Sequence, residues 1–430
     1  MSRSHLSLDQ VNRMRIAGEV YTRRSVLGGG AKVAGGLFAA GPVAAFISAC
    51  GGDDGGNGTG GGTIREIGLS LTEDPRILGP FEDETGIRVE GRSEGLGDQI
   101  SFWQQNHQQY DINQVNFNQI GAIQDTLRTI PVDDIPAWNN DISPLFREPG
   151  VPGYNEQSGW PLAGIYTEEA IANESSDEMW GVPTWYGFDA FGYIDGETGG
   201  DLESYGAIFD PENEGRATLL DEPITSVMKV ATFLSATGQA SFDGPINNLT
   251  ADDLEICFDF LAEQKSRGQF RLFWSDFGQL VDLLVAGEVF VGDFWASACA
   301  AAVQQGANAV FVNDPTEGSN GWLQGATVSK DTQSYDQVTE FISWSLDSGV
   351  LGEVLGLQGY YTPRPDVVQP RLEDSMETND QYNDWEYWWQ GAVPEERPAL
   401  EDRLPKIADW QAYPDEFEEY SRRWTQFVAA

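Results

Sequence analysis

The centre of the chain shows the clearest alternation of apolar and polar positions. An apolar, strand-like run covers residues 289–295, an alanine-rich helical run covers 296–305, and a second apolar strand covers 309–312. This order predicts a β-α-β unit. Trp295 ends the first strand and Trp322 follows the second. Because ligands of open α/β sheets lie at the carboxyl ends of strands, we expect both tryptophans at the mouth of a binding site.

The rest of the chain repeats the alternation of strand and helix. Gly86 has the C-cap position of a helix predicted at 77–84, which follows a strand at 64–71. Thr250 and Asp253 form a variant of the capping box, at the start of a helix that reaches about residue 266. Further patterns predict strands at 110–116, 217–220 and 273–276, and helices at 100–109, 120–129, 224–237, 277–286, 335–348 and 416–428. The pattern indicates an α/β protein.

The first 63 residues have the features of an export signal followed by a flexible tether. Residues 22–27 (TRRSVL) resemble a twin-arginine export signal, and a run of small and apolar residues follows to Ser48. Residues 47–50 (ISAC) resemble a lipobox, so we expect residues 1–49 to be removed and Cys50 to carry lipid; an uncleaved membrane anchor is the alternative. The glycine-rich segment 50–63 is typical of a flexible tether. These features predict a protein anchored on the extracytoplasmic face of the cell membrane.

The charge of the chain limits its partners. The formal net charge is −43 for the whole chain, and residues 50–430 carry 19 basic and 66 acidic side chains. Such a field repels nucleic acid. Lysine is scarce, with five against twenty arginines. An acidic, lysine-poor surface keeps a protein hydrated where salt is high, which indicates a halophilic source; an ordinary acidic secreted protein is the alternative.

Few residues support enzymatic or metal chemistry. His5 and His107 are the only histidines, and no Gly-x-Ser-x-Gly motif occurs. A histidine-based triad or zinc site would therefore rest on His107 alone. Pairs of acidic residues like those of glycosidases occur throughout so acidic a chain, so their presence neither supports nor excludes a glycosidase. Cys257 and Cys299 lie in apolar helical runs; a disulfide between them stays open, although free buried thiols are favoured. We expect no enzyme activity, no cofactor and no metal.

Several motifs in order resemble one family. Residues 81–89 (FEDETGIRV) resemble the N-terminal signature of family 1 extracellular solute-binding proteins of ABC importers. Trp295, Glu317-Gly318, Trp322 and residues 359–365 (GYYTPRP) occur in the order, and near the spacing, of the spermidine/putrescine-binding type. The resemblance covers roughly residues 64–367.

The resemblance implies a fold and its lobes. It implies a type II, two-lobed, periplasmic-binding-protein-like α/β fold, with two mixed sheets flanked by helices and a ligand cleft between the lobes. The expected first lobe comprises residues 64–186 and 323–358. The expected second lobe comprises residues 187–322 and 359–430.

The resemblance also implies a set of ligand-binding residues, drawn from both lobes. These candidates are Trp295, Trp322, Gln324, Asp74, Asn116, Asn118, Asp189, Ser226, Tyr360 and Gln390.

Two of these candidates depart from the polyamine pattern. Gln324 stands where polyamine binders have an ammonium-binding aspartate, and Ser226 stands near the position of a second carboxylate. The aromatic frame is kept while the carboxylates are lost or moved, with Asp74, Asp189 and Asp293 as available replacements.

The resemblance predicts a monomeric lipoprotein that captures a small organic solute, spermidine or putrescine above others, by closing its lobes. It would deliver the solute to the transmembrane subunits of an ABC permease. A sugar or ferric-iron binder on the same fold is the alternative, with a secreted carboxylate-dependent glycosidase behind it.

Overall fold

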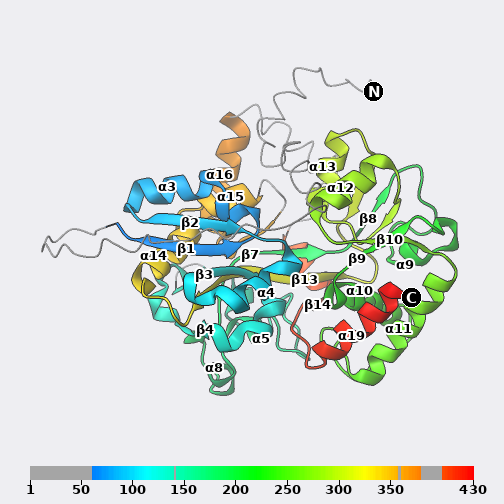
Figure 1. The fold of residues 1–430 in the computed structure, drawn as a ribbon, viewed down its shortest axis with the longest axis horizontal. Coiled ribbons are helices and arrows are strands. Elements are labelled where there is room, and N and C mark those ends of the chain that lie inside the picture. Colours follow the sequence, from blue (N-terminus) through cyan, green and yellow to red (C-terminus); the bar gives the residue numbers. More distant parts are fainter. Residues whose placement is uncertain (1–60, 140–141, 357–359, 379–399) are drawn as a thin grey trace, which may run out of the picture. The chain divides into compact units, whose positions relative to one another are not determined.

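Two mixed β-sheets organise residues 62–430 in a computed structural model of the protein (Figure 1). The structure describes residues 61–139, 142–356, 360–378 and 400–430. The expected signal, Cys50 and the candidate Gln390 lie outside these residues. Among the described residues, no helix combines the length and the apolar character needed to cross a bilayer.

The first sheet has seven strands. Its order is β14-β13-β3-β1-β2, and β4 and β7 also pair with β13. Strands β1, β2 and β3 are parallel to one another, whereas β13 runs antiparallel to β3 and β7. The strands are β1 (Thr63–Gly68), β2 (Arg88–Ser93), β3 (Ile112–Asn116), β4 (Leu127–Arg128), β7 (Val182–Asp189), β13 (Ser319–Ser329) and β14 (Ile407–Trp410). A separate pair joins β5 (Ile130–Pro131) to β6 (Glu178–Met179).

Helices cover both faces of the first sheet. Successive side chains of a strand point to opposite faces, so each strand contributes residues to the packing on both sides. On β3, Asn113 accepts a hydrogen bond from Gln99 of α4, while Gln114 lies on the other face, with residues of α3, α14 and α15. The helices of this part are α3 (Pro75–Thr85), α4 (Leu96–Asn106), α5 (Ile120–Ile123), α6 (Pro136–Asn139), α7 (Leu162–Ile165), α8 (Glu168–Ala172), α14 (Tyr335–Asp347), α15 (Val350–Gly356), α16 (Pro365–Thr378) and α18 (Leu400–Arg403).

The second sheet has five strands in the order β10-β9-β11-β8-β12. Leu219 of β9 faces a core with α10, α11 and α19, and Leu220 faces a separate core with α12 and α13. The strands are β8 (Phe191–Ile194), β9 (Ala217–Leu220), β10 (Phe270–Trp274), β11 (Val291–Gly292) and β12 (Ala309–Val312). The helices are α9 (Gly206–Phe209), α10 (Pro223–Ala236), α11 (Ala251–Ser266), α12 (Phe277–Ala286), α13 (Ala296–Gln304) and α19 (Phe417–Ala429).

The chain passes between the two sheets at three places in the described residues. Ala190 alone separates β7 of the first sheet from β8 of the second. β12 of the second sheet leads to β13 of the first, and β14 of the first leads to α19, which packs on a core of the second. Side chains at the ends of β7 and β14 are therefore held where the two parts meet.

The predicted β-α-β unit is present as β11, α13 and β12, with β8 inserted antiparallel between its two strands. The first strand is shorter than expected, since only Val291 and Gly292 pair. The capping box at Thr250 is confirmed. Cys257 and Cys299 are both free and buried.

The helix predicted at 120–129 is wrong beyond residue 126: α5 ends at Ile123, and a 3-10 turn follows at Gln124–Thr126. Thr126 donates its hydroxyl hydrogen to the backbone oxygen of Ile123 and accepts a hydrogen bond from the Trp103 indole, so the helix ends there. Leu127 and Arg128 then extend to pair with β13. A threonine that bonds to nearby backbone competes with helix continuation.

Candidate functional site

Three aromatic side chains, Trp185, Trp322 and Tyr360, form a cluster that we call the aromatic cluster. Trp185 lies on β7 and Trp322 on β13, with ring centroids 6.3 Å apart, and Tyr360 lies 5.5 Å and 5.4 Å from the two. All three pairs meet edge to face, an arrangement that stabilises aromatic pairs. Gly187 makes room for it, because a Cβ there would lie 2.4 Å from the Trp322 ring.

The aromatic cluster reaches the helix that follows β11. The hydroxyls of Ser297, on α13, and Tyr360 lie 3.2 Å apart. Trp295, the residue before α13, packs edge to face on Trp274 with 4.8 Å between centroids. The cluster of the first sheet and the start of α13 in the second part are thus in direct contact.

A small cavity lies beside the cluster, on the face of the first sheet that α3, α14 and α15 cover. The centre of a water molecule can occupy about 30 Å³ of this cavity. Glu66, Gln114, Trp185 and Gln324 contribute polar groups to its wall. Burial raises the pKa of Glu66 to about 8, opposed by a hydrogen bond from Gln114. The remaining lining residues are Leu69, Leu71, Thr72, Ile77, Thr184, Phe341, Ser345 and Leu351.

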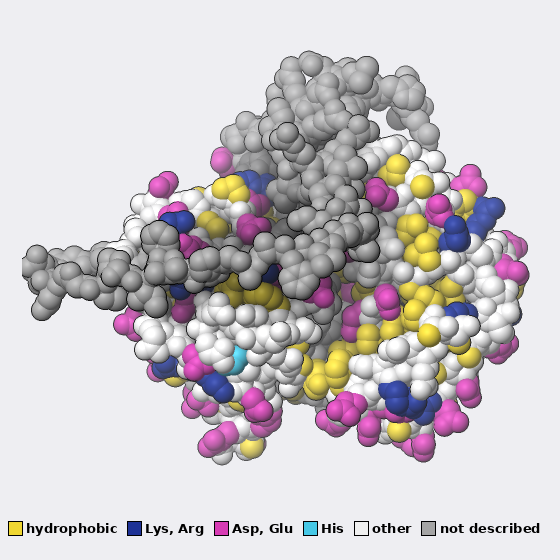
Figure 2. All heavy atoms as spheres, in the orientation of Figure 1, with side chains coloured by type: hydrophobic (Ala, Val, Ile, Leu, Met, Phe, Trp, Pro, Cys, Tyr) yellow, Lys and Arg dark blue, Asp and Glu magenta, His cyan; other side chains and the backbone are white. Residues whose placement is uncertain are grey.

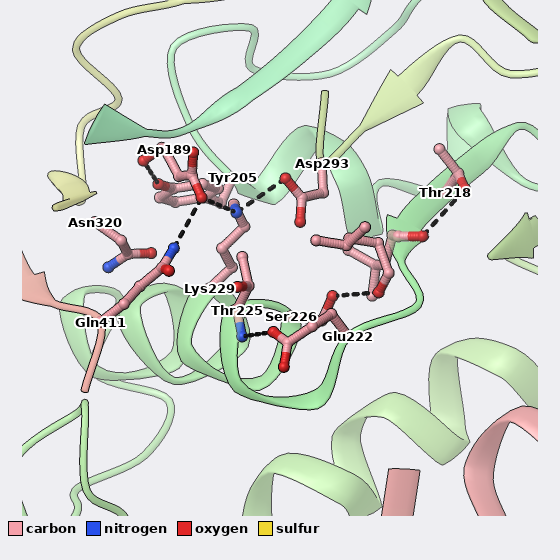
Figure 3. A network of polar contacts seen from close by, with 12 residues as sticks. Asp189, Tyr205, Thr218, Glu222, Thr225, Ser226, Lys229, Asp293, Asn320 and Gln411 are labelled. Atoms are coloured by element: carbon pink, nitrogen blue, oxygen red, sulfur yellow. Dashed lines mark hydrogen bonds and ion pairs between the residues drawn. The ribbon is translucent and has the colours of Figure 1, made fainter. Parts of the chain in front are cut away.

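A polar network lies at the crossings between the sheets (Figure 3). Gln411, just after β14, donates from Nε2 to Oδ2 of Asp189 at the end of β7, 2.8 Å away. The Oε1 of the same side chain accepts from Asn118 at 3.1 Å and from Asn116 at 3.5 Å. Gln411 therefore connects the carboxyl end of β3 to the crossing strand.

The network continues into the second part through a buried cation, Lys229 of α10. Its Nζ lies 2.9 Å from Oδ1 of Asp293 and 3.7 Å from Oδ2 of Asp189. Burial by itself would lower the pKa of Lys229, but Coulombic attraction to Asp293 and Asp189 raises it. Burial also raises the pKa of Asp293, against the attraction of Lys229. Glu222, whose carboxylate caps α10, adds to the negative charge around Lys229.

The structure brings most of the predicted site residues into these three groups. Trp322 and Tyr360 form the aromatic cluster, and Gln324 lines the adjoining cavity, where its Nε2 donates to the Gln114 backbone oxygen at 3.3 Å. Asn116, Asn118 and Asp189 meet at Gln411. Trp295 lies two residues before the Ser297 contact.

Asp74 and Ser226 make structural contacts in this structure. Asp74 caps α3 and pairs with Arg76, with 2.6 Å between Oδ2 and Nη2. Ser226 is buried in α10 and donates to the Leu220 backbone oxygen at 2.7 Å. Both bonds hold helix ends in place. The binding roles expected for these two residues stay predictions.

Several residues of the site were not predicted, among them Trp185, Ser297, Gln411, Lys229 and Glu66. Two of them carry a sequence signal. Glu66 is two residues after Ile64 in a predicted strand and is therefore expected on the same face as that apolar residue. Lys229 is one of only five lysines and lies in an apolar helix. A charge within an apolar run marks a position that needs a partner or a function.

Acidic side chains are spread over the visible face of the described residues, with fewer lysines and arginines between them (Figure 2). They do not gather into metal-binding groups: within the described ranges, no three His, Cys, Asp or Glu side chains are placed to hold a metal ion.

The likeness of this chain to known proteins lies in its fold. No protein-family model and no curated protein matches the sequence. The spermidine/putrescine ABC transporter substrate-binding protein of Streptococcus pneumoniae matches over 85% of this chain and 98% of its own, with a TM-score of 0.58 and 18% identity. A lipoprotein of Treponema pallidum matches over 86% and 100%, with a TM-score of 0.58 and 11% identity.

A third solved structure with this fold contains glucopine. The PBP MotA of A. tumefaciens B6, solved in complex with glucopine, matches over 85% of this chain and 99% of its own, with a TM-score of 0.56 and 12% identity. Together the matches confirm the predicted fold class, the two-sheet α/β fold of periplasmic-binding-protein-like solute binders.

Proposed function

We propose that this chain is the extracytoplasmic solute-binding component of an ABC importer, and that it captures a small organic cation of the polyamine class rather than catalysing a reaction. The observation that carries the proposal is the aromatic cluster, which meets α13 through the 3.2 Å contact between Tyr360 and Ser297. The contact links the aromatic cluster on the first sheet to α13 of the second part, and ligand sites occur preferentially at such interfaces.

The chemistry of this place suits a cation with an alkyl chain. The faces of Trp185 and Trp322 offer apolar contact together with attraction for a cation. Asp189 and Asp293 supply negative charge nearby, only part of which Lys229 compensates. The strong net negative charge of the chain raises the local concentration of cations, although salt screens this effect.

Capture proceeds by closure of two lobes built on the two sheets. A ligand that contacts both lobes favours the closed state by its differential affinity. The bounds expected from the sequence are residues 64–186 with 323–358, and 187–322 with 359–430. We extend the first lobe to the whole of β7 and β13, because both strands belong to the first sheet. Within the last segment, β14 pairs with β13 of the first sheet and α19 packs on the second, so we place the lobe boundary after β14.

The setting follows from the N-terminal motifs. A twin-arginine signal at residues 1–49 exports the protein, Cys50 carries a lipid, and residues 50–63 tether the binding domain outside the membrane. The closed monomer docks on the permease. A surface this acidic suits a halophilic cell.

A sugar or a related polyhydroxylated solute is the second candidate. The amides of Gln324, Asn116, Asn118 and Gln411 gather around the site. An amide can both donate to and accept from a hydroxyl group, whereas it offers an ammonium ion only its carbonyl oxygen. The ferric-iron alternative receives less support, because the Tyr361 hydroxyl accepts a hydrogen bond from Arg403.

A thermal-shift screen at constant high ionic strength separates these candidates. Putrescine or spermidine is expected to raise the melting temperature, since a ligand at a hundred times its Kd stabilises the folded state by about 2.7 kcal/mol. Sodium chloride at matched ionic strength is the control for non-specific charge effects. A shift with sugars and none with polyamines would reject the polyamine, and no shift with any solute would reject the proposal of capture.

A further inference from the structure

The cavity beside the aromatic cluster contains an unusual group, the carboxyl of Glu66. Its side chain is on β1, only 1% exposed, and the structure gives it a single hydrogen bond, from Gln114 Nε2 at 3.2 Å. No arginine, lysine or histidine lines the cavity within the described residues. A buried carboxyl without a cation is costly, so its presence in the wall of a cavity requires a reason.

The cavity wall also contains a polar group without a partner. Trp185 is 7% exposed, and its indole N–H finds no hydrogen-bond acceptor among the described residues. Trp185 belongs to the aromatic cluster and to the cavity wall at once. The cavity and the aromatic cluster therefore share one wall residue. The indole N–H is a hydrogen-bond donor, as is an ammonium group, so Glu66 is the group of this pair that can accept a hydrogen bond from a bound cation.

We propose that this cavity is a subsite for one alkyl-ammonium end of the captured solute, with the Glu66 carboxylate as its counter-ion. The proposal rests on the proposed function and adds to it, because Gln324 in the same wall has no charge to offer. Glu66 and the solute's terminal nitrogen would form the buried ion pair, and Trp185 and Leu71 would contact the adjoining methylene groups.

The size and the lining of the cavity favour an ammonium group over a metal ion. One water molecule needs roughly 10–15 Å³ on this measure, so a cavity of about 30 Å³ admits an ammonium group and little more. Sodium or calcium would require about six oxygen ligands, whereas most of the wall consists of Leu69, Leu71, Ile77, Phe341 and Leu351.

Occupation by an ammonium group changes the protonation of Glu66. Burial raises its pKa to about 8 in the free protein, so near pH 7 the carboxyl holds a proton that it must lose to pair with a cation. The other side chains that line the cavity are all neutral: Leu69, Leu71 and Thr72, Ile77 of α3, Gln114 of β3, Thr184 and Trp185 of β7, Gln324 of β13, Phe341 and Ser345 of α14, and Leu351 of α15. Binding therefore releases a proton from Glu66.

Titration calorimetry with putrescine tests the subsite. The wild-type protein and Glu66→Gln are titrated at pH 6, 7 and 8, at constant salt and in two buffers of different ionisation enthalpy. Putrescine keeps both charges in this range, because alkyl-ammonium groups titrate near ~10.4. For the wild type we expect release of up to one proton, and an affinity that rises by up to about tenfold per pH unit below pH 8. For Glu66→Gln we expect no proton release and at least a tenfold weaker affinity at pH 8.

Glu90→Gln is the matched control, because it removes the same charge from an exposed position on β2 of the same sheet. Its affinity and proton release should equal those of the wild type. Equal affinity and equal proton release for the wild type and Glu66→Gln would overturn the subsite and leave the proposed function standing. A wild-type protein that binds no putrescine, spermidine or other alkyl-ammonium solute would overturn both.

Discussion

Replacing Lys229 with methionine is expected to destabilise the folded protein by roughly 3–5 kcal/mol, because removal of one partner leaves the other buried charges unpaired. Lys229 is 1% exposed and Asp293 is fully buried, with 2.9 Å between their charged atoms. Methionine keeps most of the side-chain length and volume, so loss of packing contributes little. Chemical denaturation at neutral pH measures the effect.

An exposed ion pair is the matched control. Arg271 and Glu288 lie 2.7 Å apart with about half of each side chain exposed, so Arg271→Met should cost less than about 1 kcal/mol. Adding Asp293→Asn to Lys229→Met should restore part of the lost stability, since it removes a carboxylate that has lost its counter-ion. Equal, small losses for Lys229→Met and Arg271→Met would show that Lys229 does not hold the network together.

Glu66→Gln is expected to stabilise the free protein at pH 8.5 and to leave its stability unchanged at pH 4. The pKa of Glu66 rises from 4.5 to about 8 on folding, so the folded state binds the extra proton between these values. The wild type therefore loses stability as pH rises through this window and reaches a constant level above pH 8. At about 1.4 kcal/mol per pKa unit, the full difference approaches about 5 kcal/mol, as an upper bound.

The free energies of unfolding of the wild type and of Glu66→Gln are measured from pH 4 to pH 9 at constant salt. Their difference at each pH isolates the contribution of the Glu66 carboxyl. Burial also raises the pKa of Asp409 to about 6, and that of Asp293, and both groups contribute equally to the two proteins. Glu90→Gln should follow the wild-type curve. Parallel curves for wild type and Glu66→Gln at all pH values would mean that the Glu66 carboxyl is solvated in solution.

Local apolar patterns in the sequence predicted the strands and helices of most of the fold correctly. The strands Ala217–Leu220 and Ala309–Val312 and the helix Phe277–Ala286 have the bounds that their apolar patterns predict. Gly287 ends that helix with a φ of 65°, a left-handed conformation that glycine adopts at little cost. At these elements, the local conformational preferences of the sequence and the tertiary packing favour the same structure.

The site was less predictable, because its contacts join distant segments. Gln411 and Asp189 are 222 positions apart, and no local pattern connects them. The cleft position expected for Asp74 came from the resemblance alone, whereas Asp74-Pro75 is also a common start for a helix, and the structure shows it as the cap of α3. The sequence places Glu66 on the same strand face as Ile64, but only the packed structure shows that it lines a cavity.

The claim that the aromatic cluster binds the solute is tested most directly by titrating the strongest polyamine ligand into wild type, Trp322→Ala, Trp322→Phe and Trp180→Ala. Trp180 is a matched control: it is half-buried like Trp322, and its indole bonds to Glu168. Loss of the Trp322 face should cost about 2–4 kcal/mol of binding free energy, or roughly 30- to 1000-fold in affinity. We predict this loss for Trp322→Ala, a smaller loss for Trp322→Phe and wild-type affinity for Trp180→Ala. Wild-type affinity in a folded Trp322→Ala protein would contradict the account.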